Sequence, residues 1–163
     1  MRLTIPELAT GTDTIKAALA YAAAGWYVLP VAPRDKKHPG SVVGNHWPAQ
    51  SSRDPEQIVA WFAGTDYSIA LHLGRSGAVA FDFDDPGEMP GVLRVAALRD
   101  DVPYQATRLA EADRGHYLFA VPEGRSLGNS KGKLAGAWGE VRGRNGVIIV
   151  EPSQHENANK GAR

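Results

Sequence analysis

The sequence of 163 residues contains no cysteine, carries no formal net charge and has no long apolar run. Without cysteine, neither a disulfide nor a thiolate zinc site can form. The apolar runs are too short to cross a bilayer and no basic-then-apolar leader follows Met1, so we expect a cytosolic (host-cytoplasmic) protein with no membrane contact. Zero net charge argues against binding nucleic acid by bulk electrostatics alone.

The charges that are present are unevenly distributed. Residues 102–163 contain nine Lys/Arg and six Asp/Glu, so the preceding part of the chain is acidic to the same extent. Because this bias is mild, we expect any polyanion to be held in a local groove rather than by a basic face. The length and a hydrophobic content of 43% predict one globular domain over residues 1–163.

Three segments predict helices. Residues 12–25 are alanine-rich, with Thr12 or Thr14 available as the N-cap. Residues 52–64 carry the clearest signals, because Asp54 suits the N-cap and is followed by proline at the first helical position. Residues 89–100 form the third, an arginine-bearing amphipathic segment.

Strands and turns dominate the rest of the chain. Residues 68–74 and 78–84 are apolar runs separated by three residues, which predicts a hairpin. Residues 138–150 predict a second hairpin, since Asn145-Gly146 is a strong turn signal. The pattern predicts an α+β fold with mixed or antiparallel sheets flanked by helices.

The run from Ala78 to Asp84 reads as a buried strand that ends in carboxylates. Alternate residues of a strand point the same way, so Asp82 and Asp84 share one face while Phe81 and Phe83 occupy the other. Two carboxylates this close repel each other unless a cation lies between them, and a divalent ion with oxygen ligands is a common solution. The alternative is a strand that ends in a solvated turn, because Asp-x-Asp is a short and frequent pattern.

Two later strands supply groups that metal-assisted phosphate chemistry uses. Glu140 is a candidate third carboxylate, His116 an imidazole for a phosphate oxygen, and Arg142 a planar fork for a triphosphate. Gly115, directly before the histidine, permits close approach of another backbone. Each signal also has an ordinary explanation: Glu140 and Arg142 suit a salt bridge, and His116 suits a satisfied core histidine. A further histidine, His72, is more typical of a structural residue than of a metal ligand.

Taken together, the order and spacing of these motifs resemble the bifunctional primase-polymerase domain of the archaeo-eukaryotic primase superfamily, found in phage and plasmid replication proteins. The specific matches are the acidic pair and the histidine-led strand. The full set of matching segments is Ala17–Trp26, the loop lysines that end in His38-Pro39, Trp47 followed by Asp54–Ile58, Ile69–Gly74, Phe81–Asp84, Arg114–Phe119, Gly139–Gly143 and Val150–His155.

The resemblance implies an RRM-like catalytic core that joins nucleoside triphosphates into primers, or extends them, on a single-stranded DNA template. By motif, Asp82, Asp84 and Glu140 correspond to the family's three carboxylates, which bind one or two Mg²⁺ or Mn²⁺ ions. His116 corresponds to its nucleotide-binding histidine. Weaker correspondences for the triphosphate are Arg142, one of Lys36 and Lys37, and Ser153.

The sequence departs from the family pattern at two points. The third acid is usually an aspartate, and the longer Glu140 stands here. The frequent zinc-bearing insertion is impossible without cysteine, so we expect no zinc. Relatives often continue into a helicase, so we expect this domain to have been cut from a longer replication protein with a helicase domain downstream. We also expect the isolated domain to be monomeric.

Two other functions remain open at this stage. One is a nucleotide-binding or single-strand-binding module without catalysis, which the balanced charge and the missing zinc insertion favour. The other is a metal-dependent nuclease, because paired aspartates also serve phosphodiester hydrolysis.

Overall fold

The computed structural model describes residues 4–35, 38–107, 111, 113–130 and 136–153. Within these residues, short helices alternate with seven strands. In chain order the elements are α1 (Thr14–Ala23), β1 (Val28–Val31), α2 (Trp47–Gln50), α3 (Pro55–Phe62), β2 (Ser68–His72), β3 (Ala78–Phe83), the 3₁₀ helix η1 (Pro86–Glu88), α4 (Gly91–Ala97), β4 (Tyr104–Ala106), β5 (Gly115–Ala120), the 3₁₀ helix η2 (Gly136–Trp138), β6 (Gly139–Arg142) and β7 (Val147–Val150).

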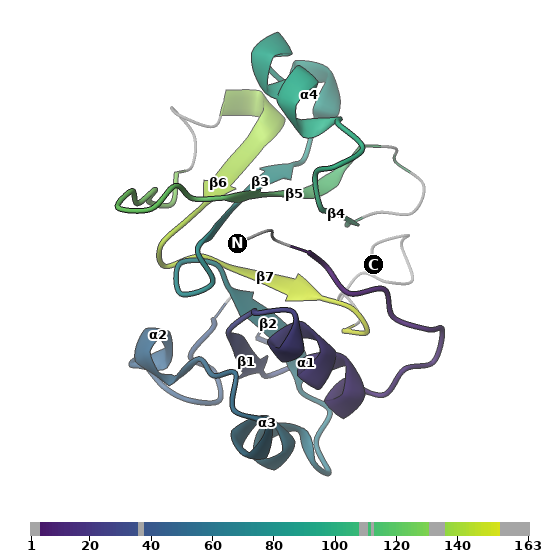
Figure 1. The fold of residues 1–163 in the computed structure, drawn as a ribbon, viewed down its shortest axis with the longest axis vertical. Helices are drawn as coiled ribbons and strands as arrows, with labels where there is room; N and C mark the ends of the chain where they lie inside the picture. The colour runs from purple at the N-terminus through teal and green to yellow at the C-terminus, as the bar shows by residue number, and fades with distance from the viewer. Residues whose placement is uncertain (1–3, 36–37, 108–110, 112, 131–135, 154–163) are drawn as a thin grey trace.

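The strands form two antiparallel sheets, with the orders β1-β2-β7 and β4-β5-β3-β6. In Figure 1 the four-stranded sheet lies in the upper half beside α4, and the three-stranded sheet lies below it with α1 and α3. This arrangement confirms the α+β fold with antiparallel sheets and flanking helices. None of the helices in the described parts of the chain has both the length and the apolar character that crossing a membrane requires.

One core joins the two halves. It contains α1, α3 and one face of the three-stranded sheet, together with Ala78, Ala80 and Leu118 of the four-stranded sheet. A second core covers the opposite face of the four-stranded sheet, where Phe83 packs with Trp138 and Tyr117 beneath α4. The face of β3 that carries Ala78 and Ala80 is therefore the face that points toward the other sheet.

Both predicted hairpins are wrong. β2 and β3 lie in different sheets, and so do β6 and β7. Instead, β2 pairs with β7 and β3 pairs with β6, and between these ladders the Leu73 amide donates to the Gly146 carbonyl at 3.0 Å. The two segments cross from one sheet to the other side by side. Glycine-containing turn signals mark a change of direction, but they do not specify which sheet receives the next strand.

The helix predictions hold in position and differ at the ends. Asp54 caps α3, since its carboxylate accepts a hydrogen bond from the Glu56 amide at 3.0 Å, as expected. The cap of α1 is Asp13, whose carboxylate accepts from the Lys16 amide at 2.9 Å, rather than Thr12 or Thr14. α4 covers seven residues of the twelve predicted.

His72 is a structural histidine, as predicted. It lies buried on β2, where its Nε2 is 3.0 Å from the Arg144 carbonyl oxygen and its Nδ1 is 2.9 Å from the Ser51 hydroxyl. Because a carbonyl only accepts, Nε2 carries the proton and Nδ1 accepts from Ser51. The neutral imidazole thus ties the crossover before β7 to the end of α2.

We expect this histidine to make the fold sensitive to mild acid. Burial lowers the pKa of His72 below 6.5; the charge of Arg75 acts in the same direction, and the hydrogen bond to Arg144 opposes both. The unfolded chain therefore takes up this proton at a higher pH than the folded chain, so the His72 contribution is present above pH 6.5 and is lost as the pH falls below it. Thermal unfolding between pH 8 and 5 should show a smaller decline for His72→Gln than for the wild type. An identical pH dependence in the two proteins would contradict this assignment.

Candidate active site

Four polar residues form a row across the four-stranded sheet. The register places Gln105 of β4 opposite His116 of β5, His116 opposite Asp82 of β3, and Asp82 opposite Glu140 of β6. Directly opposed residues in antiparallel strands point to the same face, with Cβ atoms about 5 Å apart. We call these four residues the polar row. It brings together Asp82, Glu140 and His116, three of the side chains that the sequence singled out.

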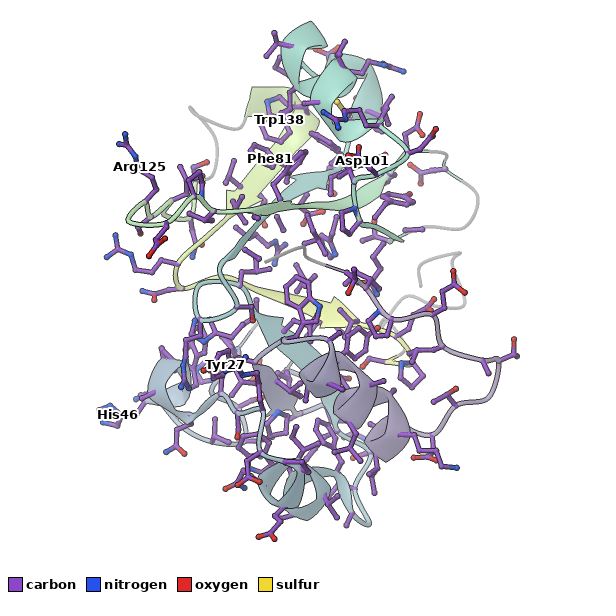
Figure 2. All side chains as sticks on the ribbon, in the orientation of Figure 1. Tyr27, His46, Phe81, Asp101, Arg125 and Trp138 are labelled. Atoms are coloured by element: carbon purple, nitrogen blue, oxygen red, sulfur yellow. The ribbon has the colours of Figure 1, made fainter. Side chains whose placement is uncertain are left out.

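The alternation of β3 explains why the polar row is accessible from one side only. Phe81 and Phe83 point away from it and contact Trp138, with ring centroids 6.2 and 5.2 Å from the indole. Figure 2 shows Phe81 and Trp138 together in the upper half of the molecule. Phe81 and Phe83 thus anchor β3 in the core on one face, as expected. On the other face of β3, Asp82 follows Ala78 and Ala80, at the point where the shared core ends.

Asp82 has two charged or polar partners in the polar row region, and its side chain is only 10% exposed. Its Oδ2 lies 3.5 Å from His116 Nε2 and 2.7 Å from Arg142 Nη2. Burial by itself raises the pKa of Asp82, but the hydrogen bond and charge of His116, followed by those of Arg142, outweigh it and lower the pKa to about 2. Asp82 is therefore an ionised carboxylate at neutral pH.

Arg142 joins two members of the polar row. Its Nη2 lies 2.7 Å from Asp82 Oδ2 and 2.6 Å from Glu140 Oε1, so one guanidinium nitrogen bridges both carboxylates. Glu140 and Arg142 lie on the same face of β6, and the salt bridge between them that the sequence suggested is present. A positive group thus occupies the space between the two acids.

Asp84 lies one position beyond the end of β3, and its side chain is 60% exposed. Its Oδ1 lies 3.2 Å from Arg114 Nη2, and the same guanidinium donates to Glu111 Oε2 at 2.8 Å. These contacts raise the pKa of Arg114, with the hydrogen bond to Glu111 as the largest cause. Asp84 therefore stands at the rim, paired with an arginine that precedes the β5 histidine by two residues.

The oxygen donors and the charge of this region suit a divalent cation. Four carboxylates, those of Asp82, Asp84, Glu140 and Glu111, face two guanidiniums, so negative charge is in excess. As the side chains stand, no three acidic or histidine residues in the described ranges converge closely enough to hold a metal ion. The physical reason is that Arg142 and Arg114 already bind the carboxylates that such an ion would share.

Two buried polar atoms of the polar row lack hydrogen-bond partners among the described residues. They are Nδ1 of His116 and Oε1 of Gln105, two residues that pair with each other across β5 and β4. A buried polar atom without a partner costs about 1–3 kcal/mol. The pair therefore marks a place where a polar ligand or water gains two partners.

Glycines at two strand starts permit this close packing. A Cβ on Gly115 would collide with the Gln105 carbonyl oxygen, which confirms the expected close approach of another backbone. A Cβ on Gly139 would collide with the Asp82 carbonyl oxygen, and the Gly139 φ of 147° is unfavourable for other residues. The spacing between β3 and its two neighbours depends on both residues.

We expect Gly139→Ala to displace β6 from β3. The added methyl group meets backbone atoms that have no alternative rotamer, and the strained φ costs about 1–3 kcal/mol. The thermal midpoint should fall by several degrees, and Arg142 should lose its bridge between Asp82 and Glu140. Gly91→Ala is the matched control, because a Cβ there meets nothing within 4 Å. Equal midpoints for the two variants would refute the steric account.

The remaining predicted residues have different outcomes. Lys36 and Lys37 lie outside the described residues. Ser153 lies three residues after the end of β7, beside the other sheet, where its hydroxyl accepts a hydrogen bond from the Ile69 amide of β2 at 2.7 Å. Its position is explained by that bond, so the structure does not bring it into contact with the polar row.

Sequence reasoning missed Gln105 and gave Arg114 no role. Gln105 occupies a short strand with no motif of its own, and only the pairing with β5 brings it beside His116. Arg114 had a usable signal, because it stands two residues before His116 and so faces the same side of an extended chain.

Comparison with known families gives one match. The family model described as "Prim-Pol: Bifunctional DNA primase/polymerase, N-terminal" matches residues 18–162. No curated protein and no solved structure matches the chain.

Proposed function

Since the chain belongs to the bifunctional DNA primase/polymerase N-terminal family, we propose that it is a metal-dependent nucleotidyltransferase that synthesises or extends primers on single-stranded DNA. Membership of the family implies primase/polymerase-type activity in general. The specific reaction proposed is the attack of a primer 3′-hydroxyl on the α-phosphate of a nucleoside triphosphate, with release of pyrophosphate. This role fits the replication of a phage or plasmid genome.

The observation that carries the proposal is the direct opposition of His116, Asp82 and Glu140 across β5, β3 and β6. A buried ionised carboxylate, a second acid and an imidazole on adjacent strands are the groups that phosphoryl chemistry requires close together. Structural ion pairs also shift pKa values, so the proposal rests on the geometry: the two acids and the imidazole face one another, and His116 Nδ1 and Gln105 Oε1 beside them offer further hydrogen bonds to a polar ligand.

Each residue of the region has a proposed task. Nδ1 of His116, when it carries a proton, donates to an oxygen of the incoming nucleotide, and Oε1 of Gln105 accepts from a hydroxyl or N–H group of the same ligand. Arg142 holds the triphosphate once its bonds to the two acids are exchanged for bonds to phosphate oxygens, which guanidinium groups bind well. Arg114 and Asp84, which pair with each other at the rim of this region, lie where the nucleotide would enter.

Asp82, Glu140 and Asp84 are the residues that would hold Mg²⁺ or Mn²⁺. When bound, such an ion stabilises the negative charge that develops on the phosphate and on the attacking and leaving oxygens. The low pKa of Asp82 keeps its carboxylate ready for this role at neutral pH without a proton to displace. Glu140, with its longer side chain, reaches the same space from the opposite strand.

The decisive experiment is synthesis on a defined single-stranded template. The chain is incubated with Mg²⁺ or Mn²⁺ and either ribonucleoside or deoxyribonucleoside triphosphates, with and without an annealed primer. We expect primer extension that depends on the metal and on triphosphates. Template cleavage in the absence of triphosphates would instead indicate a nuclease, and binding of the template without incorporation would indicate a non-catalytic module.

A further inference from the structure

A second feature with concentrated charge lies at the far end of β3 from Asp82. Two adjoining cavities of about 610 and 660 Å³ share Gly77, Val121, Pro122 and Glu123. We call them together the arginine groove, because four arginines line them: Arg125 and Arg144 in one cavity, Arg53 and Arg75 in the other. In Figure 2, Arg125 projects from the left edge of the upper half, and Tyr27 lies below it in the lower half.

The charge of the arginine groove is uncompensated. Glu123 is the one carboxylate among its lining residues, against four guanidiniums. The ion pairs found within the described residues involve none of the four arginines. For a chain with no net charge, this is a marked local excess of positive charge.

Three of the guanidiniums are held in place by neutral partners. Arg75 stacks 4.0 Å from the centroid of the Tyr27 ring, and its Nη1 donates to the carbonyl oxygens of Ala49 and Ser51. Arg53 lies 4.5 Å from the same centroid and donates to the Tyr27 hydroxyl at 3.2 Å.

Arg144 donates from Nε to the Ser126 hydroxyl at 2.9 Å. Each of these three guanidiniums thus has a partner within the protein before any anion arrives. Two like charges beside one ring repel each other, and a polyanion relieves that repulsion. The arrangement therefore suits a ligand that carries several negative charges.

The arginine groove is connected with the polar row. Ala78, which lines it, precedes Asp82 by four residues on β3, a distance of about 13 Å in a strand. Arg144 follows Arg142 by two residues on the neighbouring segment. The separation along β3 is that of a few nucleotides of an extended single strand, which would run outside the shared core because Ala78 and Ala80 are buried in it.

We propose that the arginine groove binds the sugar-phosphate backbone of single-stranded DNA a few nucleotides from the polar row. This inference rests on the proposed function for the identity of the ligand. Guanidiniums bind phosphate oxygens well, and each has five N–H donors, so those not engaged by the protein remain for phosphate. Because contacts to phosphates carry no information about the bases, binding is independent of base sequence and strongly dependent on salt.

The test measures binding of a fluorescent 20-nucleotide dT oligomer by anisotropy, with the double variant Arg53→Gln/Arg125→Gln. Arg75 is left intact because it holds the backbone of residues 49–51. The control, Arg94→Gln/Arg99→Gln, removes two exposed charges at α4 and directly after it. At low salt we expect roughly tenfold weaker binding for the groove variant and no change for the control. The slope of log K against log salt should fall by about 1.4, corresponding to two phosphate contacts on a single strand.

Other results would overturn the inference. The first is a groove variant that binds the oligomer as tightly as the control variant does. The second is a groove variant that loses as much affinity for a free fluorescent nucleoside triphosphate as for the oligomer, because the groove would then be a triphosphate subsite. A second pair, Arg53→Lys/Arg125→Lys, keeps the charge and should keep most of the salt slope, which separates loss of charge from loss of fold.

Because binding is measured without synthesis, the two proposals fail separately. Groove-dependent DNA binding by a chain that incorporates no nucleotide supports this inference and refutes the proposed function. If the chain is an active polymerase and its groove variant binds DNA normally, the proposed function is supported and this inference is refuted.

Discussion

Replacing Asp82 with asparagine is expected to reduce primer extension by about a thousandfold or more. The change keeps the shape of the side chain and removes its negative charge. Charge stabilisation of several kcal/mol at a phosphoryl-transfer site corresponds to at least this factor, since each 1.4 kcal/mol is tenfold in rate. Asp82 is the buried centre of the polar row, so neither Asp84 nor Glu140 can take its position.

The measurement is incorporation of labelled nucleotide on a primed template with Mn²⁺, at a temperature well below the thermal midpoint of both proteins. Asp54→Asn is the matched control, because asparagine also caps a helix and α3 should remain intact. Template binding by Asp82→Asn should equal that of the wild type, because the arginine groove is unaltered. Full incorporation by Asp82→Asn would end the proposal that the polar row is catalytic.

Arg142→Gln should destabilise the protein in the absence of divalent ions and make it respond more strongly to them. Removing the guanidinium leaves Asp82 and Glu140 opposite each other without the cation that both contact. Loss of one partner from a buried charge cluster costs about 3–5 kcal/mol, and we expect about 2–3 kcal/mol here because Arg142 is 34% exposed. Mn²⁺ placed between the two acids restores the missing positive charge.

Thermal unfolding with increasing MnCl₂ checks this prediction. The midpoint of Arg142→Gln should start below that of the wild type and rise more steeply with the metal. Arg99→Gln breaks an exposed pair with Asp101 and should change neither the midpoint nor the response to metal. If Mn²⁺ stabilises Arg142→Gln no more than the wild type, the space between Asp82 and Glu140 is not a cation site. This readout is independent of catalysis.

Predictions from local pattern succeeded where the structure depends on local chemistry. The Asp54 cap and the proline after it start α3 as expected, since both act within one helical turn. The alternation of β3 separates Asp82 from Phe81 and Phe83, because opposite side-chain directions follow from the extended backbone itself. The two hairpin predictions were wrong for the converse reason. β2 does not pair with β3, and β6 does not pair with β7; each pairs instead with strands that are distant in the sequence or lie before it.

The sequence by itself therefore determined which residues face together within each strand, where α3 begins, and, through its motifs, the family to which the chain belongs. Only the tertiary structure decided that His116, Asp82 and Glu140 stand in register with Gln105, that Arg142 occupies the space between two acids, and that four arginines from separate segments line one groove. The physical reason is that side-chain direction along a strand is a property of consecutive backbone angles. The choice of neighbouring strand depends instead on packing between residues far apart in the chain.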